Sequence, residues 1–111
     1  MLILRTVLVV HLAVLTGYTI VVIQNHGMNL LPVFFGDMAA MAWPGQFNLD
    51  FMGFLILSAI WTAWRNGFSA LGLVLAVIAF FGGMAFLSIY LLILSLGTDS
   101  IRDILLGINT R

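Results

Sequence analysis

The sequence predicts an all-α membrane protein, a three-transmembrane-helix bundle that forms one integral membrane domain over residues 1–111, and two observations lead to this prediction. The chain is 63% hydrophobic and only 7% charged, whereas a soluble domain has roughly a quarter of its residues charged. The few charges also leave three uncharged stretches, at 6–36, 51–64 and 66–98. Since a spanning helix needs about 20 apolar residues, we expect lipid to surround the chain.

The apolar run around Arg5 predicts a first transmembrane helix over residues 2–23. The run is too long for the apolar part of a secretory signal, and no small-residue cleavage site follows it, so we expect a retained helix. The next apolar stretch, 30–43, contains Pro32, Gly36 and Asp37. It is too short and too interrupted to cross a bilayer, so we predict an interfacial or shallow re-entrant segment.

The remaining elements follow a turn signal at Pro44-Gly45. We predict a second transmembrane helix over 47–64 and a third over 70–96, joined by a tight turn and therefore antiparallel neighbours. In the tail, apolar residues recur at helical spacing after three residues that can cap a helix. We therefore expect a short amphipathic C-terminal helix, 99–109, on the membrane surface.

The third helix carries a stripe of small residues, which lets helix backbones approach closely in lipid. Its members are Gly72, Ala76, Ala79 and Gly83. One interpretation is packing against the other two helices of the same chain. The other is an oligomer seam, and the spacing alone does not decide between them.

Four residues are candidates for ligand binding. His11 lies near the middle of the first helix, where an ionisable group suggests a function, and Tyr18 lies two turns along the same face. A neutral imidazole could ligate a pigment metal, relay protons or simply donate a structural hydrogen bond. His26 and Asp50 belong to a polar group at one membrane face, which could be a pocket covered by 30–43 or ordinary interfacial solvation.

Several function classes find no support in the sequence. The net charge is zero and lysine is absent, so nothing indicates nucleic-acid binding, and the absence of cysteine excludes disulfides and thiolate metal sites. No nucleophile motif, phosphate-binding loop or metal-ligand spacing is present. We therefore expect no enzymatic activity and no metal site, and the sequence identifies no cofactor.

The chain resembles a family of small, uncharacterised bacterial three-helix membrane proteins over about residues 5–92. The resemblance rests on the run LTGYTIVVIQNHG at 15–27 and on the following positions: Asp50, Trp61 or Trp64 with Arg65, Gly82-Gly83 and Tyr90-Leu91. The connection at 28–47 is longer than in the family, Gly-Met-Ala stands where a proline is expected, and the tail is additional. The resemblance implies the three-helix fold and no established activity.

From these observations the leading hypothesis is a non-catalytic membrane subunit, either self-assembling or an accessory in a larger complex. The alternatives are a binder of an apolar ligand or pigment such as quinone, carotenoid, haem or chlorophyll, and an oligomeric transporter or channel. We expect the partners to be the lipid bilayer and other membrane subunits or copies of the chain. The expected location is a bacterial inner membrane with the N-terminus cytoplasmic, although three straight spans divide the four arginines two against two.

Overall fold

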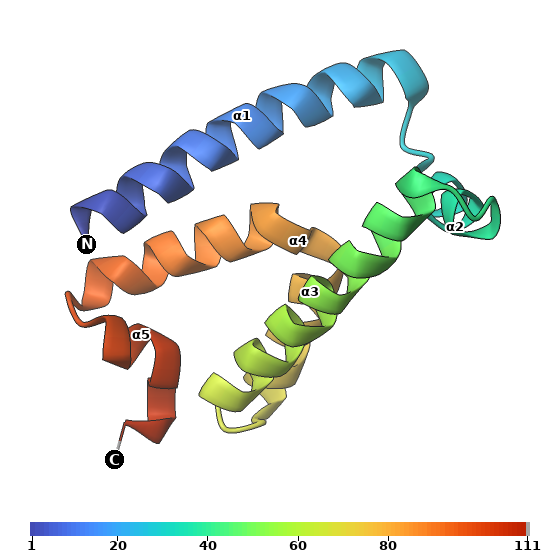
Figure 1. The fold of residues 1–111 in the computed structure, drawn as a ribbon. Helices are drawn as coiled ribbons and strands as arrows, with labels where there is room; N and C mark the ends of the chain where they lie inside the picture. The colour runs from blue at the N-terminus through green and yellow to red at the C-terminus, as the bar shows by residue number, and fades with distance from the viewer. Residues whose placement is uncertain (111) are drawn as a thin grey trace.

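The computed structural model describes residues 1–110, which form helices joined by short turns (Figure 1). The helices are α1 (Leu2–His26), α2 (Leu30–Ala39), α3 (Trp43–Arg65), α4 (Ala70–Gly97) and α5 (Ile101–Leu106), followed by a short 3-10 helix, η1 (Gly107–Asn109). Three of these helices, α1, α3 and α4, are long and apolar enough to cross a membrane. The predicted all-α class is confirmed, with three long apolar candidate spans, a short apolar helix between the first two and a short C-terminal helix.

The connection between α1 and α3 contains a shorter helix than the predicted segment 30–43. α2 ends at Ala39, and Met41 has a positive φ of 57° that no helix interior accepts. α3 then begins at Trp43, four residues before the predicted start at 47. Pro44 allows this early start, because a proline in the first turn lacks only an N–H that would have no helical partner.

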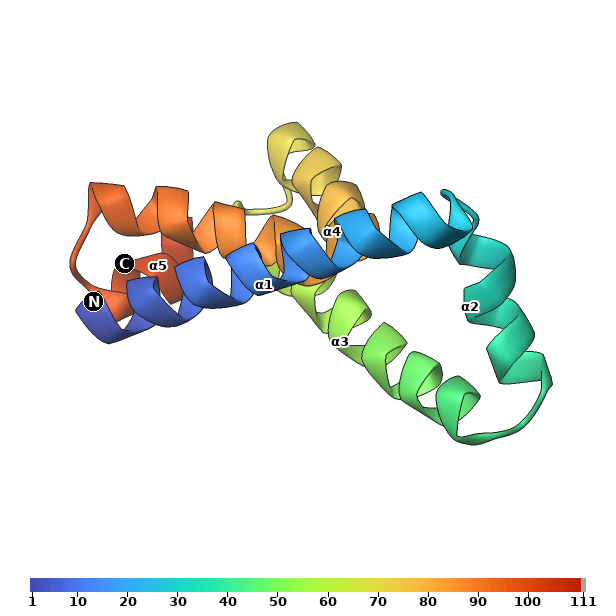
Figure 2. The ribbon, with the colours of Figure 1, turned by 90° about the horizontal axis from the view of Figure 1, so that it is seen from above.

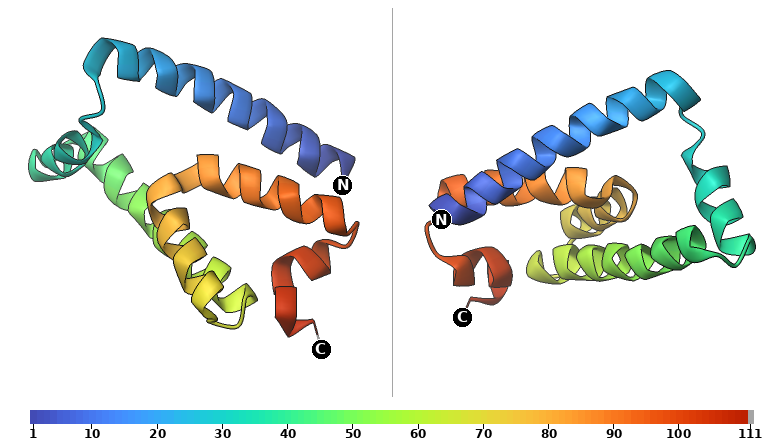
Figure 3. Two further views of the ribbon diagram at one scale, coloured as in Figure 1. Left: turned by 180° about the vertical axis from the view of Figure 1, so that it is seen from behind. Right: turned by 45° about the horizontal axis from the view of Figure 1, so that its top comes forward.

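α4 differs most from the expectation of one continuous third helix. Its backbone is non-helical at Gly83, where φ is 54° and ψ is −137°. Glycine alone adopts this conformation readily, because it has no Cβ to clash with the neighbouring carbonyl. The ribbon is therefore bent at Gly83, and the two halves of α4 form a V whose open ends lie at the same end of the molecule (Figures 1 and 3).

The two halves of α4 have different neighbours. α3 lies along the first half, and α1 lies along the second half, so that α4 stands between them (Figures 1 and 2). α2 packs against the start of α3 at the other end of the molecule. The buried apolar side chains are few, and two of the four are alanines: Leu8, Ala63, Ala79 and Ile104. Most large apolar side chains face outward, as expected of helices that contact a lipid bilayer.

The C-terminal segment folds back over the end of α3. The Ser100 hydroxyl caps α5 by accepting from the Asp103 amide, and Ile104 is only 2% exposed. η1 continues the segment until Asn109, whose side-chain amide donates to the Trp64 carbonyl at 2.9 Å. The tail is therefore held by contacts with α3. Its sequence pattern alone predicts only an amphipathic helix on the membrane surface.

Candidate functional site

The densest group of polar contacts lies where α3 ends, and Arg65 is at its centre. Its Nε donates to the Ile104 carbonyl at 2.8 Å, and Nη1 donates to the Tyr90 hydroxyl at 2.9 Å. The Asn66 amide donates to the same hydroxyl at 3.0 Å. The cluster of Arg65, Asn66, Tyr90 and Trp61, which we call the arginine clamp, thus joins α3, the second half of α4 and α5.

Aromatic rings surround the guanidinium of the clamp. The Arg65 Cζ lies 5.9 Å from the Trp61 ring centroid and 5.7 Å from that of Tyr90, both within cation–π range. The two rings meet edge to face, and Phe86 stacks on Tyr90. The Trp61 indole also donates to the Leu105 carbonyl at 2.9 Å. The ring faces of Trp61 and Tyr90 and the carbonyl oxygens near the end of α5 therefore stabilise the positive charge of Arg65.

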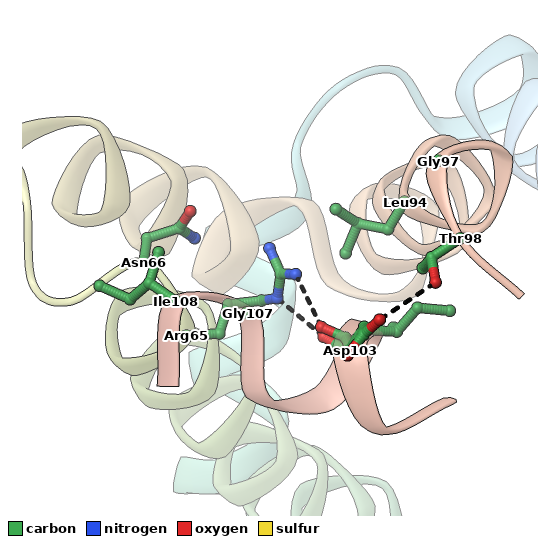
Figure 4. A pocket seen from close by; sticks show the side chains of 9 residues that line it. Arg65, Asn66, Leu94, Gly97, Thr98, Asp103, Gly107 and Ile108 are labelled. Carbon is green, nitrogen blue, oxygen red and sulfur yellow. Dashed lines mark hydrogen bonds between the residues drawn. The ribbon is translucent and has the colours of Figure 1, made fainter. Parts of the chain in front are cut away.

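A hollow of about 320 Å³ opens beside the clamp (Figure 4). Arg65 lines it from the last turn of α3 and Asn66 from the residue that follows. Asp103 lines it from α5, and its carboxylate accepts from the Thr98 hydroxyl at 3.3 Å. The remaining lining residues are Leu94, Gly97, Thr98, Ile104, Gly107 and Ile108. The hollow is thus mixed in charge and largely made by the docked tail.

A second clamp ties the start of α1 to the end of α4. Arg5 donates from Nε to the Ser95 hydroxyl at 3.1 Å and from Nη2 to the Ser95 carbonyl. Its Nη2 also lies 3.5 Å from the carboxylate of Asp99, which is 92% exposed. Because Ser95 is buried and Asp99 is not, the hydrogen bonds to Ser95 define this contact more than the ion pair does.

The polar residues at the α2 end form a smaller contact. The Asn48 amide donates to the Phe34 carbonyl at 3.0 Å and lies 3.5 Å from the Asp37 carboxylate. Gly45 makes this approach possible, because a Cβ at that position would overlap the Asp37 backbone. The predicted cover of this face by segment 30–43 therefore corresponds to close packing of α2 on α3.

The four predicted ligand residues do not meet one another in this chain. His11 and Tyr18 lie on an exposed side of α1, and Tyr18 is 72% exposed. His26 and Asp50 are also exposed, at the end of α1 and in α3. Within residues 1–110 no hydrogen bond or ion pair joins any two of them, and no three His, Asp or Glu side chains gather as metal ligands.

The small-residue stripe of α4 lies mostly toward α3. Gly72 and Ala79 are buried, and a Cβ built on Gly72 would lie 2.7 Å from the Asn66 Cβ. Ala76 is half-buried and borders a shallow apolar groove between α3 and α4. Gly83 belongs to the same stripe, yet it forms the bend of α4.

Sequence reasoning did not find the arginine clamp as a unit. Trp61, Arg65 and Tyr90 stand out in the sequence only as positions of a family resemblance, and their convergence depends on the bend in α4. No family model, no curated protein and no solved structure matches the chain. The resemblance described above therefore extends only to a small membrane protein with three long apolar helices.

Chemically, Arg65, Asn66 and Trp61 of the arginine clamp and Arg5 of the second clamp donate hydrogen bonds to backbone carbonyls and to the hydroxyls of Tyr90 and Ser95. Arg65, Asn66, Trp61 and Asn109 each close a contact between helices distant in sequence. The bonds to the Ile104 and Leu105 carbonyls fall in the last turn of α5, where carbonyls lack a partner within the helix. These hydrogen bonds hold the helices together, and they use donors of Arg65, Asn66, Trp61 and Arg5.

Proposed function

We propose that this protein is a non-catalytic integral membrane subunit that self-assembles through α1. One observation carries the proposal. The His11 imidazole is exposed near the middle of a 25-residue apolar helix and has no hydrogen-bond partner within residues 1–110. A polar group facing hydrocarbon without a partner costs several kcal/mol, on the order of the penalty for an unpaired amide or hydroxyl.

Three of the exposed polar residues of α1 form a regular stripe. His11, Tyr18 and Asn25 are seven residues apart, and Val7 extends the stripe one turn toward the N-terminus. All four are exposed, while a neighbouring flank of α1, about 60–100° around the helix, contacts α4 through the buried Leu8. A seven-residue repeat keeps side chains on the seam between two left-handed supercoiled helices, so a second helix fits this stripe.

The chemistry of the stripe favours a second copy of the same chain as the occupant. Neutral imidazole, phenol and carboxamide each carry both a hydrogen-bond donor and an acceptor. Each can therefore pair with its own copy across a two-fold axis, where residue i meets residue i. The stripe has no Asp, Glu, Lys or Arg, so two copies meet without charge repulsion.

Disulfide cross-linking in lipid tests the proposal, because the chain has no native cysteine. Val7→Cys places a thiol on the stripe, and Val9→Cys places one on the other side of the helix at similar exposure, 56% against 52%. We expect Val7→Cys to form a cross-linked dimer at low protein-to-lipid ratio and Val9→Cys to stay monomeric. Equal cross-linking of both, or of neither, contradicts self-assembly through this stripe.

The variant His11→Leu separates self-assembly from the alternatives. Interhelical hydrogen bonds in membranes contribute about 0.6–1.7 kcal/mol, so we expect the dimer dissociation constant to rise about 3- to 20-fold. The measurement is energy transfer between labelled copies in vesicles. Loss of a co-purifying pigment in this variant, or a stoichiometric second protein on the wild-type stripe, would show a different occupant and overturn the proposal.

A further inference from the structure

The bend at Gly83 divides α4 into two pieces that are each too short to cross a bilayer. Residues 70–82 and 84–97 form the halves on either side of the bend. At 1.5 Å per residue each half is about 20 Å long, whereas the hydrocarbon core is about 30 Å thick. Only a straight α4 would cross, and α4 is not straight.

Contacts on Asn66 show that α4 turns back on itself. Gly72, in the first half, lies against Asn66, and Tyr90, in the second half, accepts a hydrogen bond from the Asn66 amide at 3.0 Å. In a straight helix Gly72 and Tyr90 would be about 27 Å apart. Both halves of α4 therefore reach the same end of α3.

The end of α4 and the tail also lie with the start of α1. Arg5 binds Ser95 near the end of α4, and Arg65 binds the Ile104 carbonyl of α5. α1 leads from this end of the molecule to α2, and α3 leads back (Figures 1 and 2). If α1 and α3 cross the bilayer, the N-terminus, the turn after Arg65 and the tail all lie at one face.

The bend lies inside the span of α3 rather than at its far end. A Cβ built on Gly83 would contact Phe51 and Leu55 at 3.4 and 3.5 Å. Phe51 precedes Arg65 by 14 residues, a rise of about 21 Å, and about 12 Å of α3 continues beyond it to Trp43. α4 thus descends along α3, turns and returns before it reaches the α2 face.

The distribution of charge agrees with this path. Arg5 bonds to the end of α4, and Arg65 bonds to α5, the helix that contains Arg102, whereas residues 6–64 contain no Arg or Lys. The fourth arginine, Arg111, is the last residue of the sequence and lies outside the described residues. Cytoplasmic loops carry the excess of Arg and Lys, so a folded-back α4 replaces an even division of arginines by a one-sided one.

We propose that α4 is a re-entrant helix that enters and leaves the bilayer at the cytoplasmic face, with its turn at Gly83. Both chain termini and the arginine clamp then lie at that face, and α2 lies at the opposite one. The backbone at the turn has the protein neighbour that irregular structure at membrane depth requires, because Phe51 and Leu55 of α3 cover it. The arginine-bearing face then meets the anionic leaflet, whose negative surface potential attracts Arg side chains.

Single-cysteine accessibility in sealed, oriented membrane vesicles tests this topology. The sites are Ile3→Cys at the N-terminus, Asn29→Cys before α2, Phe68→Cys between α3 and α4, and Thr110→Cys at the tail. A membrane-impermeant maleimide is expected to label Ile3→Cys, Phe68→Cys and Thr110→Cys from one face and Asn29→Cys from the other. Labelling in detergent confirms that each thiol is reactive.

Only one of these sites distinguishes a re-entrant α4 from a crossing one. Three full crossings put Thr110→Cys with Asn29→Cys, and that result overturns the proposal. Labelling of Ile3→Cys and Phe68→Cys from different faces also overturns it, because α1 and α3 would then not both cross. A spin-label distance between Leu71→Cys and Leu96→Cys gives a second measurement, and a peak near the ~38 Å of a straight helix contradicts the turn.

Discussion

Replacing Gly83 by alanine tests the bend that organises the whole fold. The φ of 54° and ψ of −137° place Gly83 in a backbone region that side chains with a Cβ rarely adopt. Holding another residue there costs about 1–3 kcal/mol. The added Cβ itself meets only ordinary contacts, at 3.4 Å from Phe51 and 3.5 Å from Leu55. Backbone strain, not a clash, therefore sets the magnitude.

We expect Gly83→Ala to lower the free energy of unfolding by about 1–3 kcal/mol, which is about 5- to 150-fold in the unfolding equilibrium. The assay is reversible unfolding in mixed micelles by titration with a denaturing detergent, followed by circular dichroism. Gly53→Ala is the matched control, since Gly53 lies inside α3 with nothing within 4 Å of a built Cβ. It is expected to gain up to about 1 kcal/mol from helix propensity.

The result that would refute this reasoning is specific. If Gly83→Ala unfolds with the same free energy as the wild type or a higher one, while Gly53→Ala behaves as expected, then Gly83 is helical in the membrane. In that case α4 is continuous, and the contacts of Asn66 with both Gly72 and Tyr90 do not form together.

Two further predictions concern the contacts around the arginine clamp. Gly72→Ala is expected to destabilise the chain by about 1–3 kcal/mol in the same titration, because its Cβ would lie 2.7 Å from the Asn66 Cβ and 3.3 Å from the Ala63 carbonyl. Gly17→Ala, with open space around it, is its control, and equal effects of the two substitutions would contradict close packing at Gly72. Trp61→Phe keeps an aromatic ring at this position but removes the indole N–H and its 2.9 Å bond to the Leu105 carbonyl. We expect faster amide hydrogen exchange over 101–109, corresponding to about 0.5–1.5 kcal/mol, and unchanged exchange would show that the tail is not held by this bond.

The small-residue stripe illustrates how far sequence spacing can be interpreted. Gly72, Ala76, Ala79 and Gly83 have the spacing of one helical face, and Gly72 and Ala79 are indeed buried. The spacing treats all four as equivalent members of a helix. Gly83 instead leaves the helical conformation, because a glycine suits close packing and a bend equally well, and only its neighbours in space select between the two.

His11 shows the converse case: the sequence identifies the residue as unusual, but only the fold shows which side of α1 is left exposed. Its position in the middle of an apolar helix marks it as unusual from the sequence alone. The sequence left open whether His11 forms a structural hydrogen bond, relays protons or ligates a pigment metal, and in the structure both His11 and Tyr18 are exposed on α1. A helical repeat defines which residues share a face, but it does not say which face a neighbouring helix covers.

The sequence by itself determined that lipid surrounds this protein and where its long helices lie along the chain. Apolar composition and the positions of eight charged residues predict three long membrane helices, because hydrocarbon admits only segments whose backbone bonds are internal. Only the tertiary structure decided how the ends meet. The convergence of Arg5 with Ser95, and of Arg65 with Tyr90 and Ile104, joins residues 25 to 90 positions apart. These contacts depend on one glycine φ angle, and no pattern of hydropathy encodes a single dihedral.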